Sequence, residues 1–199
     1  LLDWIDKGNA FATVEWVDST HKDNAGNIKS AFIGPRPVRI SPLDIVFNPI
    51  AASFREAPKI VKTIMTVGEA KKYIDSISVT PDTQEIAGKV WNYCMEVRSN
   101  IGTGDFSEKD SYLAVDGFDS FRTYLGSQYV ELLTFYGDLY DHESGKLYEN
   151  HMIVVMDRHK IIYNQPHSYP LPEIPIYHAG WRIRQDNLWA MGPLDNLVG

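Results

Sequence analysis

The side chains best suited to chemistry are six histidines, one cysteine and a surplus of carboxylates. His142 stands between Asp141 and Glu143, and three such ligands could hold a metal ion. These residues run directly into Ser144 and Gly145, and polar, solvated side chains are typical of a tight turn. The turn is the simpler interpretation, so the sequence predicts no metal site here.

The remaining histidines and the cysteine give no converging pattern. His151 and His159 flank a strand-sized run, whereas His167 and His178 flank a proline-rich stretch. Positions at a strand end, in a turn or on the surface explain all four. Cys94 lies among apolar helix positions without a Cys-His-Asn or Ser-His-Asp signature, which indicates a small core residue. No catalytic residue is predicted.

Two segments of the chain could in principle bind phosphate or magnesium. Gly102-Thr103-Gly104 lacks the further glycine and the Lys-Ser/Thr pair of a phosphate-binding loop, which leaves a turn. A run of carboxylates follows that could hold Mg²⁺ for a nuclease, although first-turn and solvated helix positions explain it more simply. Its members are Asp105, Glu108, Asp110, Asp116 and Asp119. No cofactor is predicted.

Aromatic side chains are abundant, with 5 Trp, 11 Tyr and 8 Phe. Several crowd into one C-terminal region together with arginines. Enrichment in aromatic residues and Arg is typical of a packed protein interface. The same rings could equally close the domain's own core, and both alternatives stay open. The residues concerned are Tyr177, Trp181, Arg182, Arg184 and Trp189.

Composition and charge restrict the class of protein. The chain has 199 residues, of which 44% are hydrophobic and 23% charged, as in a globular protein with a real core. A formal net charge of −7 argues against a module that grips nucleic-acid phosphates, although DNA could still slide past an acidic wall. No apolar run reaches the roughly 20 residues that span a bilayer. A cytoplasmic origin fits the single cysteine.

The elements that must position these residues indicate an α+β fold in one body over residues 1–199. Residues 1–6 read as the last turn of a helix that ends at Gly8. Strand formers from Asn9 to Asp18 and from Ile28 to Ile33 predict an antiparallel β-hairpin. The run Gly34-Pro35-Arg36-Pro37 predicts a break in regular structure.

The middle of the chain predicts a strand followed by a helical insert at about residues 80–126. Lys59 to Met65 is β-branched, and Thr66 with Glu69 forms a capping box that opens a helix. Thr80-Pro81 opens the first helix of the insert, whose predicted core face carries Ile86, Val90, Tyr93 and Val97. A second helix is predicted from Ser107 to about Leu125-Gly126.

A three-stranded meander follows the insert. The predicted strands are Tyr129 to Tyr140, Tyr148 to Met156, and Ile161 to Tyr163. The proline-rich stretch from Gln165 to Pro175 predicts extended chain largely without ladder bonds. A helical pattern begins after Pro193. Because the chain also opens without an initiator Met, we expect a fragment cut from a longer polypeptide.

Three segments resemble the portal proteins of tailed bacteriophages. The run from Val38 to Ala51 is similar to a portal segment with an Arg-aliphatic-Ser/Asp-Pro-x-Asp pattern followed by Asp/Asn-Pro-x-Ala. The strand from Tyr129 resembles a portal Val-Glu-x-x-Glu-x-x-Gly-Asp strand, with Thr134 departing from the pattern. The end of the chain resembles a Trp-Gly-x-Gly-Pro entry into a long helix, with Ala190 departing. The matching or interface candidates are Arg39, Ser41, Pro42, Asp44, Pro49, Trp181, Arg182, Arg184, Trp189, Gly192, Pro193, Asp195 and Asn196.

This resemblance implies a non-enzymatic structural virion protein. A portal is the head-to-tail connector, a homo-oligomeric ring, usually a dodecamer, at one capsid vertex. It forms the channel through which double-stranded DNA is packaged and ejected, without sequence-specific binding, and the point where the tail attaches. Its partners would be terminase, which hydrolyses the ATP, and capsid, tail or adaptor proteins, with no membrane. We expect assembly in the host bacterial cytoplasm and a final location in the virion.

A different class of protein stays open as the alternative. The chain could be a divalent-metal-dependent phage nuclease or another phage-encoded enzyme domain. An enzyme would bring three or more carboxylates and histidines to one cleft, for example Asp105, Asp110, Asp141 and His151 around a metal. A portal fragment would instead show apolar or aromatic patches on its surface.

Overall fold

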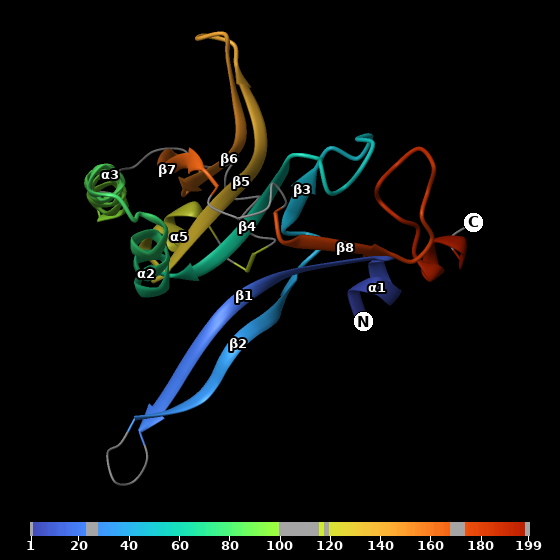
Figure 1. The fold of residues 1–199 in the computed structure, drawn as a ribbon, viewed down its shortest axis with the longest axis horizontal. Helices are drawn as coiled ribbons and strands as arrows, with labels where there is room; N and C mark the ends of the chain where they lie inside the picture. Colours follow the sequence, from blue (N-terminus) through green and yellow to red (C-terminus); the bar gives the residue numbers. More distant parts are fainter. Residues whose placement is uncertain (1, 23–27, 100–115, 118–119, 168–173, 198–199) are drawn as a thin grey trace. The chain divides into compact units, whose positions relative to one another are not determined.

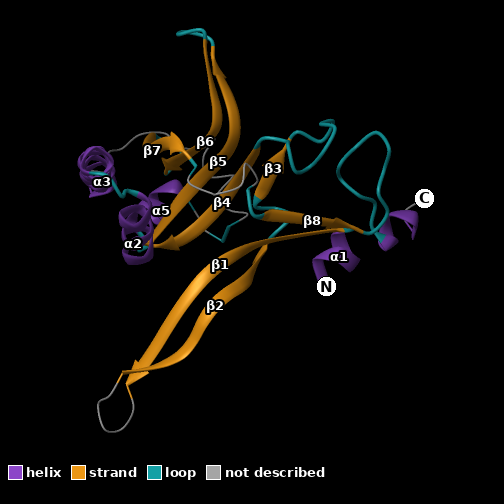
Figure 2. Ribbon diagram, viewed as in Figure 1, coloured by secondary structure: helices purple, strands orange, loops and turns teal. Residues whose placement is uncertain are grey.

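The computed structural model describes residues 2–22, 28–99, 116–117, 120–167 and 174–197. Within these ranges, four α-helices and eight strands are present, and the strands form antiparallel sheets (Figure 1, Figure 2). The α+β class predicted from the sequence is confirmed. None of the helices in the described ranges combines the length and the apolar character needed to cross a bilayer.

Backbone contacts divide the chain into two compact units. Unit 1 comprises Leu1–Lys59 and Tyr169–Gly199, so it takes residues from both ends of the chain. Unit 2 comprises Ile60–Ser168. The sequence predicts a single body over residues 1–199. The division into two compact units does not test whether the units act as one body, so the single body stays a prediction. Each unit is therefore described by itself.

Unit 1 is built on a sheet with the strand order β2-β1-β8. Helix α1 (Leu2–Lys7) ends at Gly8, whose φ of +69° is the left-handed conformation that commonly follows a helix. Strand β1 (Asn9–Lys22) then pairs antiparallel with β2 (Ile28–Ile40). The predicted helix end and the predicted hairpin are both confirmed.

Strand β8 (Ile176–Gly180) pairs with the first five residues of β1, from Asn9 to Thr13. Past Thr13, no third strand of the described chain continues this sheet. The two remaining strands run on as a ribbon, the β1–β2 arm, made of residues 14–22 and 28–37 (Figure 1). Strand β3 (Ile45–Phe47) also belongs to unit 1. The predicted C-terminal helix start is a 3-10 helix, η1 (Pro193–Leu197).

The predicted break at residues 34–37 is wrong, because β2 runs through both prolines. Pro37 pairs with Val14 and Pro35 pairs with Trp16 in unbroken register. Successive residues of a strand direct their N–H groups to opposite edges, so two prolines spaced by two residues lack donors on the same edge. β2 is the outer strand and has a neighbour on one side, so it can place this donor-free edge toward solvent without losing ladder bonds.

Unit 2 contains the strand order β4-β5-β6-β7. Strand β4 (Lys59–Thr66) begins at the boundary between the units. Strands β5 (Tyr129–Asp141), β6 (Lys146–Met156) and β7 (Lys160–Pro166) form the three-stranded meander predicted from the sequence. The predicted ladder-free stretch starts too early, because Gln165 still pairs with Met152.

Helices α2 (Val67–Ile77) and α3 (Pro81–Ser99) supply the other half of the unit 2 core. Both predicted helix starts are confirmed: Thr66 and Glu69 form a reciprocal capping box, and the Thr80 hydroxyl accepts from the Thr83 N–H. The buried cluster joins the two helices to one face of the sheet. Its members are Ala70, Ile74, Ala87, Trp91, Cys94, Val130, Leu132, Met152, Val154, Met156 and Ile162.

The predicted core face of α3 is wrong by one helical position. The buried stripe is Ala87, Trp91, Cys94 and Arg98, whereas Ile86, Tyr93 and Val97 are exposed; of the predicted face, Val90 is partly buried against the core. Two neighbouring stripes of residues along this helix both follow the 3.6-residue period, so the period alone does not decide which stripe is buried. The stripe with small Ala87 and Cys94 lets the helix approach the sheet closely, and Arg98 reaches buried acceptors at its end.

The predicted helix from Ser107 to about Leu125-Gly126 ends at Gly126 as expected, but it is not continuous over its described part, and residues 107–115 fall outside the described residues. Asp116 and Gly117 form a turn. Ser120 then caps a separate short helix, α5 (Phe121–Gly126), by accepting from the Thr123 N–H. The Ser120 cap is a local signal for this start, whereas the acidic residues after Ser107 suggest the beginning of one longer helix.

Candidate functional site

The candidate residues taken from the portal resemblance lie in unit 1, in segments far apart in the sequence, whereas the portal-like strand from Tyr129 is β5 of unit 2. Arg39, near the end of β2, makes a two-point ion pair with Asp3 of α1, and these hydrogen bonds lower the pKa of the Asp3 carboxyl. Pro49 accepts a hydrogen bond of 2.7 Å at its carbonyl oxygen from the N–H of Leu188. Both ends of the chain are thereby connected to the segment that contains the first portal-like run.

The Ser41 to Pro49 part of this run makes a turn and a short strand. The Ser41 carbonyl oxygen accepts from the Asp44 N–H at 2.9 Å, and its hydroxyl accepts from the Leu43 N–H at 3.2 Å. Pro42 lies inside this turn and Asp44 closes it. The pattern therefore sets the entry into β3, which directs Phe47 inward.

The C-terminal candidates pack against the first turn of the chain. The backbone N–H of Trp181 donates to the Gly8 carbonyl oxygen at 2.8 Å. The Trp181 ring meets the Trp4 ring edge-on, with ring centroids 4.6 Å apart. Arg182 exchanges two backbone hydrogen bonds with Met191, and Arg184 forms an exposed ion pair with Asp186. Arg182 and Arg184 therefore lie at the surface, and their contacts do not converge on a common ligand-binding site.

Gly8 and Gly192 mark the closest approach of the two chain ends, which we call the glycine crossing. A Cβ atom on Gly8 would lie 2.3 Å from the Gly192 nitrogen. Pro193 begins η1, and the Asp195 carboxylate accepts from the Gly192 N–H at 2.6 Å. Asn196 lies within η1. Backbone meets backbone here, which explains glycine on both sides.

Asn9 is a buried hub beside the glycine crossing that the sequence analysis missed. Its amide nitrogen donates to the carbonyl oxygens of Lys7 and Ala190, each at 2.8 Å. Its amide oxygen accepts from the Ala190 N–H at 2.8 Å and from His178 Nε2 at 2.9 Å. Because that oxygen only accepts, His178 must carry its proton on Nε2. Burial lowers the pKa of His178, which favours this neutral form.

An aromatic cluster fills the core of unit 1 next to this hub. Trp189 stacks on Phe47 with centroids 4.7 Å apart, and His178 stacks on Phe11 at the same separation. Phe54 packs against both phenylalanines. Trp189 and His178 therefore contribute to the unit's own core, which was one of the two alternatives left open for the C-terminal aromatic residues.

Lys59 is a buried cation at the edge of the same cluster. Its ammonium donates to the carbonyl oxygens of Arg55 at 3.1 Å and Ala57 at 2.7 Å, and lies 4.8 Å from the centre of the Phe54 ring. The residue is 1% exposed. Burial lowers the pKa of this ammonium from 10.5 to about 8.

The depressed pKa of Lys59 predicts a rise in stability at alkaline pH. Between pH 8 and 10.5 the unfolded chain holds a proton that the folded chain has lost, so raising the pH favours folding. The free energy of unfolding of the wild type should rise over this interval by on the order of 2 kcal/mol relative to Lys59→Met. Urea unfolding of both proteins across this pH range measures the difference, and parallel curves would contradict the assignment.

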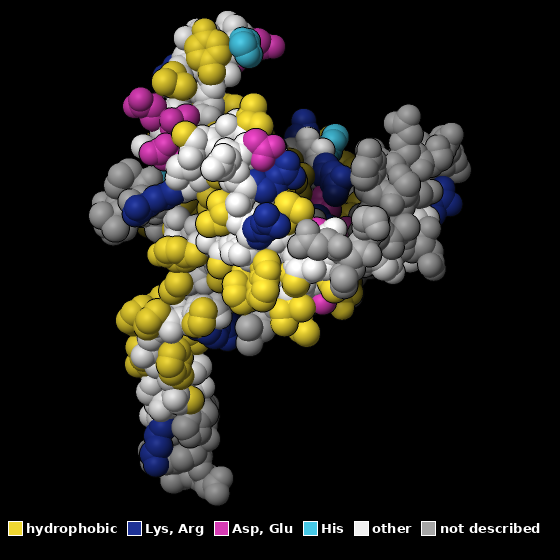
Figure 3. Space-filling view, turned by 90° about the vertical axis from the view of Figure 1, so that its right-hand side faces the viewer, with side chains coloured by type: hydrophobic (Ala, Val, Ile, Leu, Met, Phe, Trp, Pro, Cys, Tyr) yellow, Lys and Arg dark blue, Asp and Glu magenta, His cyan; other side chains and the backbone are white. Residues whose placement is uncertain are grey.

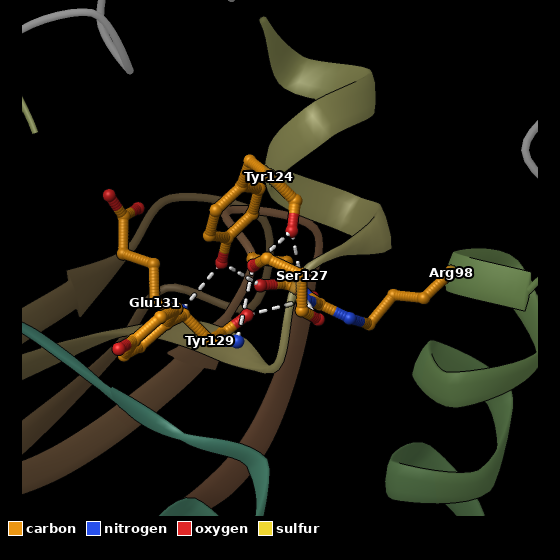
Figure 4. A network of polar contacts seen from close by, with 6 residues as sticks. Arg98, Tyr124, Ser127, Tyr129 and Glu131 are labelled. Carbon is orange, nitrogen blue, oxygen red and sulfur yellow. Dashed lines mark hydrogen bonds and ion pairs between the residues drawn. The ribbon is translucent and has the colours of Figure 1, made fainter. Parts of the chain in front are cut away.

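A second buried polar cluster lies in unit 2, at the end of α3 (Figure 4). Arg98 forms an ion pair of 2.7 Å with Asp157, and both side chains are at most 7% exposed. Its guanidinium also donates to the carbonyl oxygens of Tyr124, Ser127 and Tyr129. One side chain thus holds α3, α5 and the start of β5 together.

Tyr124 and Glu131 extend this cluster along β5. The Tyr124 hydroxyl donates to Asp157 and accepts from the Glu131 N–H at 2.5 Å. Burial, and secondarily the Asp157 charge, raise the pKa of that hydroxyl. The Glu131 carboxylate is paired at two points with Arg158, at 2.6 and 3.0 Å. These charged groups are satisfied by one another, as a cluster that stabilises the fold requires.

The described residues among those considered for metal or nucleophilic chemistry do not form a common site. The Asp141 carboxylate accepts from the Glu143 N–H at 3.0 Å and from the Ser144 hydroxyl, so the turn interpretation is confirmed. His159 stacks on Tyr93, and Cys94 is buried, which raises the pKa of its thiol to about 11. Asp105 and Asp110 fall outside the described residues, as do Glu108 and Asp119. No group of three His, Cys, Asp or Glu residues in the described part of the chain is placed to hold a metal ion.

Comparison with known proteins does not assign the chain to a family. No protein-family model matches the chain, and no curated protein is significantly similar to it.

Proposed function

We propose that this chain is a structural subunit of the portal ring of a tailed bacteriophage. The observation that carries the proposal is that two of the three portal-like segments, residues 38–51 and 189–197, meet in unit 1, where Trp189 stacks on Phe47. Arg39 binds Asp3, Pro49 binds Leu188, and the Gly192-Pro193 turn crosses the helix end at Gly8. A family pattern supports the proposal more strongly when its residues take part in one set of contacts than when they are scattered over the surface.

In this role the chain contributes geometry rather than a reaction. The ring encloses the channel for double-stranded DNA, and the terminase that docks on it supplies the work of ATP hydrolysis. The net charge of −7 suits a channel body that DNA passes without being held, since phosphate binding requires a surplus of Lys and Arg. Capsid proteins surround the ring, and tail or adaptor proteins attach to it.

Electron microscopy tests this proposal directly. We expect the purified protein, with any flanking segments its gene encodes, to form closed rings with a central channel, and mass photometry to give one multiple of the subunit mass. Gold-labelled antibodies against unit 1 should bind virions at a single vertex.

The same preparation tests the enzyme alternative. Plasmid DNA incubated with the protein and Mg²⁺ or Mn²⁺ should stay intact. Cleavage that EDTA abolishes, in a protein that forms no ring, would replace the portal proposal with a nuclease.

A further inference from the structure

The β1–β2 arm has one mainly apolar and one more polar face. Residues paired across an antiparallel ribbon share a face, and β1 keeps its alternation while β2 carries an extra residue next to Phe32. The register therefore puts one set of residues on a single face, the arm face, which is mainly apolar: Val14, Trp16, Asp18, Thr20, Ile28, Ser30, Ile33, Pro35 and Pro37.

The opposite face of the arm is more polar, although it also carries Val17 and Phe32. It carries the cross-strand ion pair of Glu15 and Arg36 at 3.4 Å, and Ser19, which bonds the Phe32 carbonyl oxygen. Of the large exposed hydrophobic side chains of the arm, Val14, Trp16, Ile28 and Ile33 lie on the arm face and Phe32 on the opposite one. One-sided sorting is what a strand pair shows when one face packs against something.

The arm face is exposed over a large area. Trp16 is 72% exposed, Ile28 70%, Ile33 56% and Val14 41%. Hydrophobic side chains gather on the upper part of the downward-pointing arm in Figure 3. With the two prolines, the face offers roughly 600 Å² of apolar surface, close to the approximately 800 Å² per partner of a standard protein interface. A two-stranded ribbon is also marginal without packing on a further element.

The chemistry of the arm restricts what can cover this face. A peptide strand added at the β2 edge would meet Pro35 and Pro37, which offer no N–H donors to it. Anionic lipid or nucleic acid would need a basic surround, but Asp18 lies on the arm face and the net charge of the chain is −7. A protein surface of ordinary polarity is the occupant that remains.

We propose that the arm face docks on a second copy of this chain, the adjacent subunit of the ring. This inference rests on the proposed function, because a ring of identical subunits supplies the same neighbour to every arm. Such a contact is heterologous: the arm of one copy meets a different surface of the next, and the rotation closes the ring. Trp16 is the anchor of the contact, since buried Trp residues dominate interface energies.

The test compares two double variants in the full protein. Trp16→Ser with Ile33→Ser removes the apolar face, whereas Glu15→Ser with Arg36→Ser alters the polar face of the same two strands. All four side chains are exposed, so both variants should fold with the wild-type melting temperature. We expect the first to weaken subunit association at least about 30-fold in sedimentation velocity and the second to leave it unchanged.

Hydrogen exchange identifies the occupant of the arm face. Amides of residues 14–20 and 28–37 should become protected as the wild-type concentration rises, in step with assembly. Protection that does not depend on concentration would mean that the arm packs within its own chain and would overturn the inference. Rings that form equally well with the Trp16→Ser, Ile33→Ser variant would overturn it too, while the proposed function stands. A wild type that forms no oligomer would overturn both.

Discussion

Replacing Arg98 with Met should lower the free energy of unfolding by about 3–5 kcal/mol, because it leaves the buried Asp157 charge without its partner. The substitution also removes donors from the carbonyl oxygens of Tyr124, Ser127 and Tyr129. Met keeps most of the aliphatic stem that packs beside Cys94 on the buried face of α3. Urea unfolding followed by circular dichroism measures the loss, and hydrogen exchange should assign it to unit 2.

Two further variants separate the charge from the packing. Arg36→Met breaks an ion pair whose side chains are 59% and 52% exposed, so it should cost at most about 1 kcal/mol. Combining Arg98→Met with Asp157→Asn should restore part of the stability, because the orphaned charge is gone. If Arg98→Met costs no more than Arg36→Met, the buried cluster does not stabilise unit 2 as inferred.

Local signals in the sequence were enough to predict most of the elements. The Thr66 and Thr80 caps, the helix end at Gly8 and the meander after Tyr129 are all found where their residue types predict them. Each depends on side chains within a few positions of one another. The proline-containing strand was missed because its tolerance depends on β2 being the outer strand, and strand order is not a local property.

The buried polar residues were harder to predict because their partners are distant. Asn9 binds Ala190, and Arg98 binds Asp157, across long stretches of chain. A signal for Arg98 was present: it continues the stripe of Trp91 and Cys94, and a charge on an apolar stripe indicates a buried partner. Glu131 between two apolar strand residues gives the same kind of signal. The sequence analysis instead took the neighbouring stripe of α3 as its core face.

Gly8→Ala should cost at least about 3 kcal/mol and disrupt the joint between the chain ends in unit 1. Two effects add here: an L-residue at a φ of +69° is strained by about 1–2 kcal/mol, and its Cβ would collide with backbone. The nearest atom, the Gly192 nitrogen, would be 2.3 Å away, a distance that only movement of the backbone could relieve. Hydrogen exchange should show the loss in residues 2–12 and 181–192.

Gly145→Ala is the matched control, because it carries the same conformational strain without the collision. Its φ is +66°, yet its nearest neighbour would be the Tyr140 hydroxyl at 3.9 Å. It should therefore cost only about 1–2 kcal/mol, and the difference between the two variants measures the glycine crossing itself. Trp4 and Trp181 report on the same joint, since their edge-on contact should give a near-ultraviolet circular dichroism signal that Gly8→Ala loses and Gly145→Ala keeps. Equal losses of stability in both variants would mean that the chain ends cross loosely, and that contacts such as the Ala190 hydrogen bonds to Asn9 hold the portal-like C-terminal turn instead.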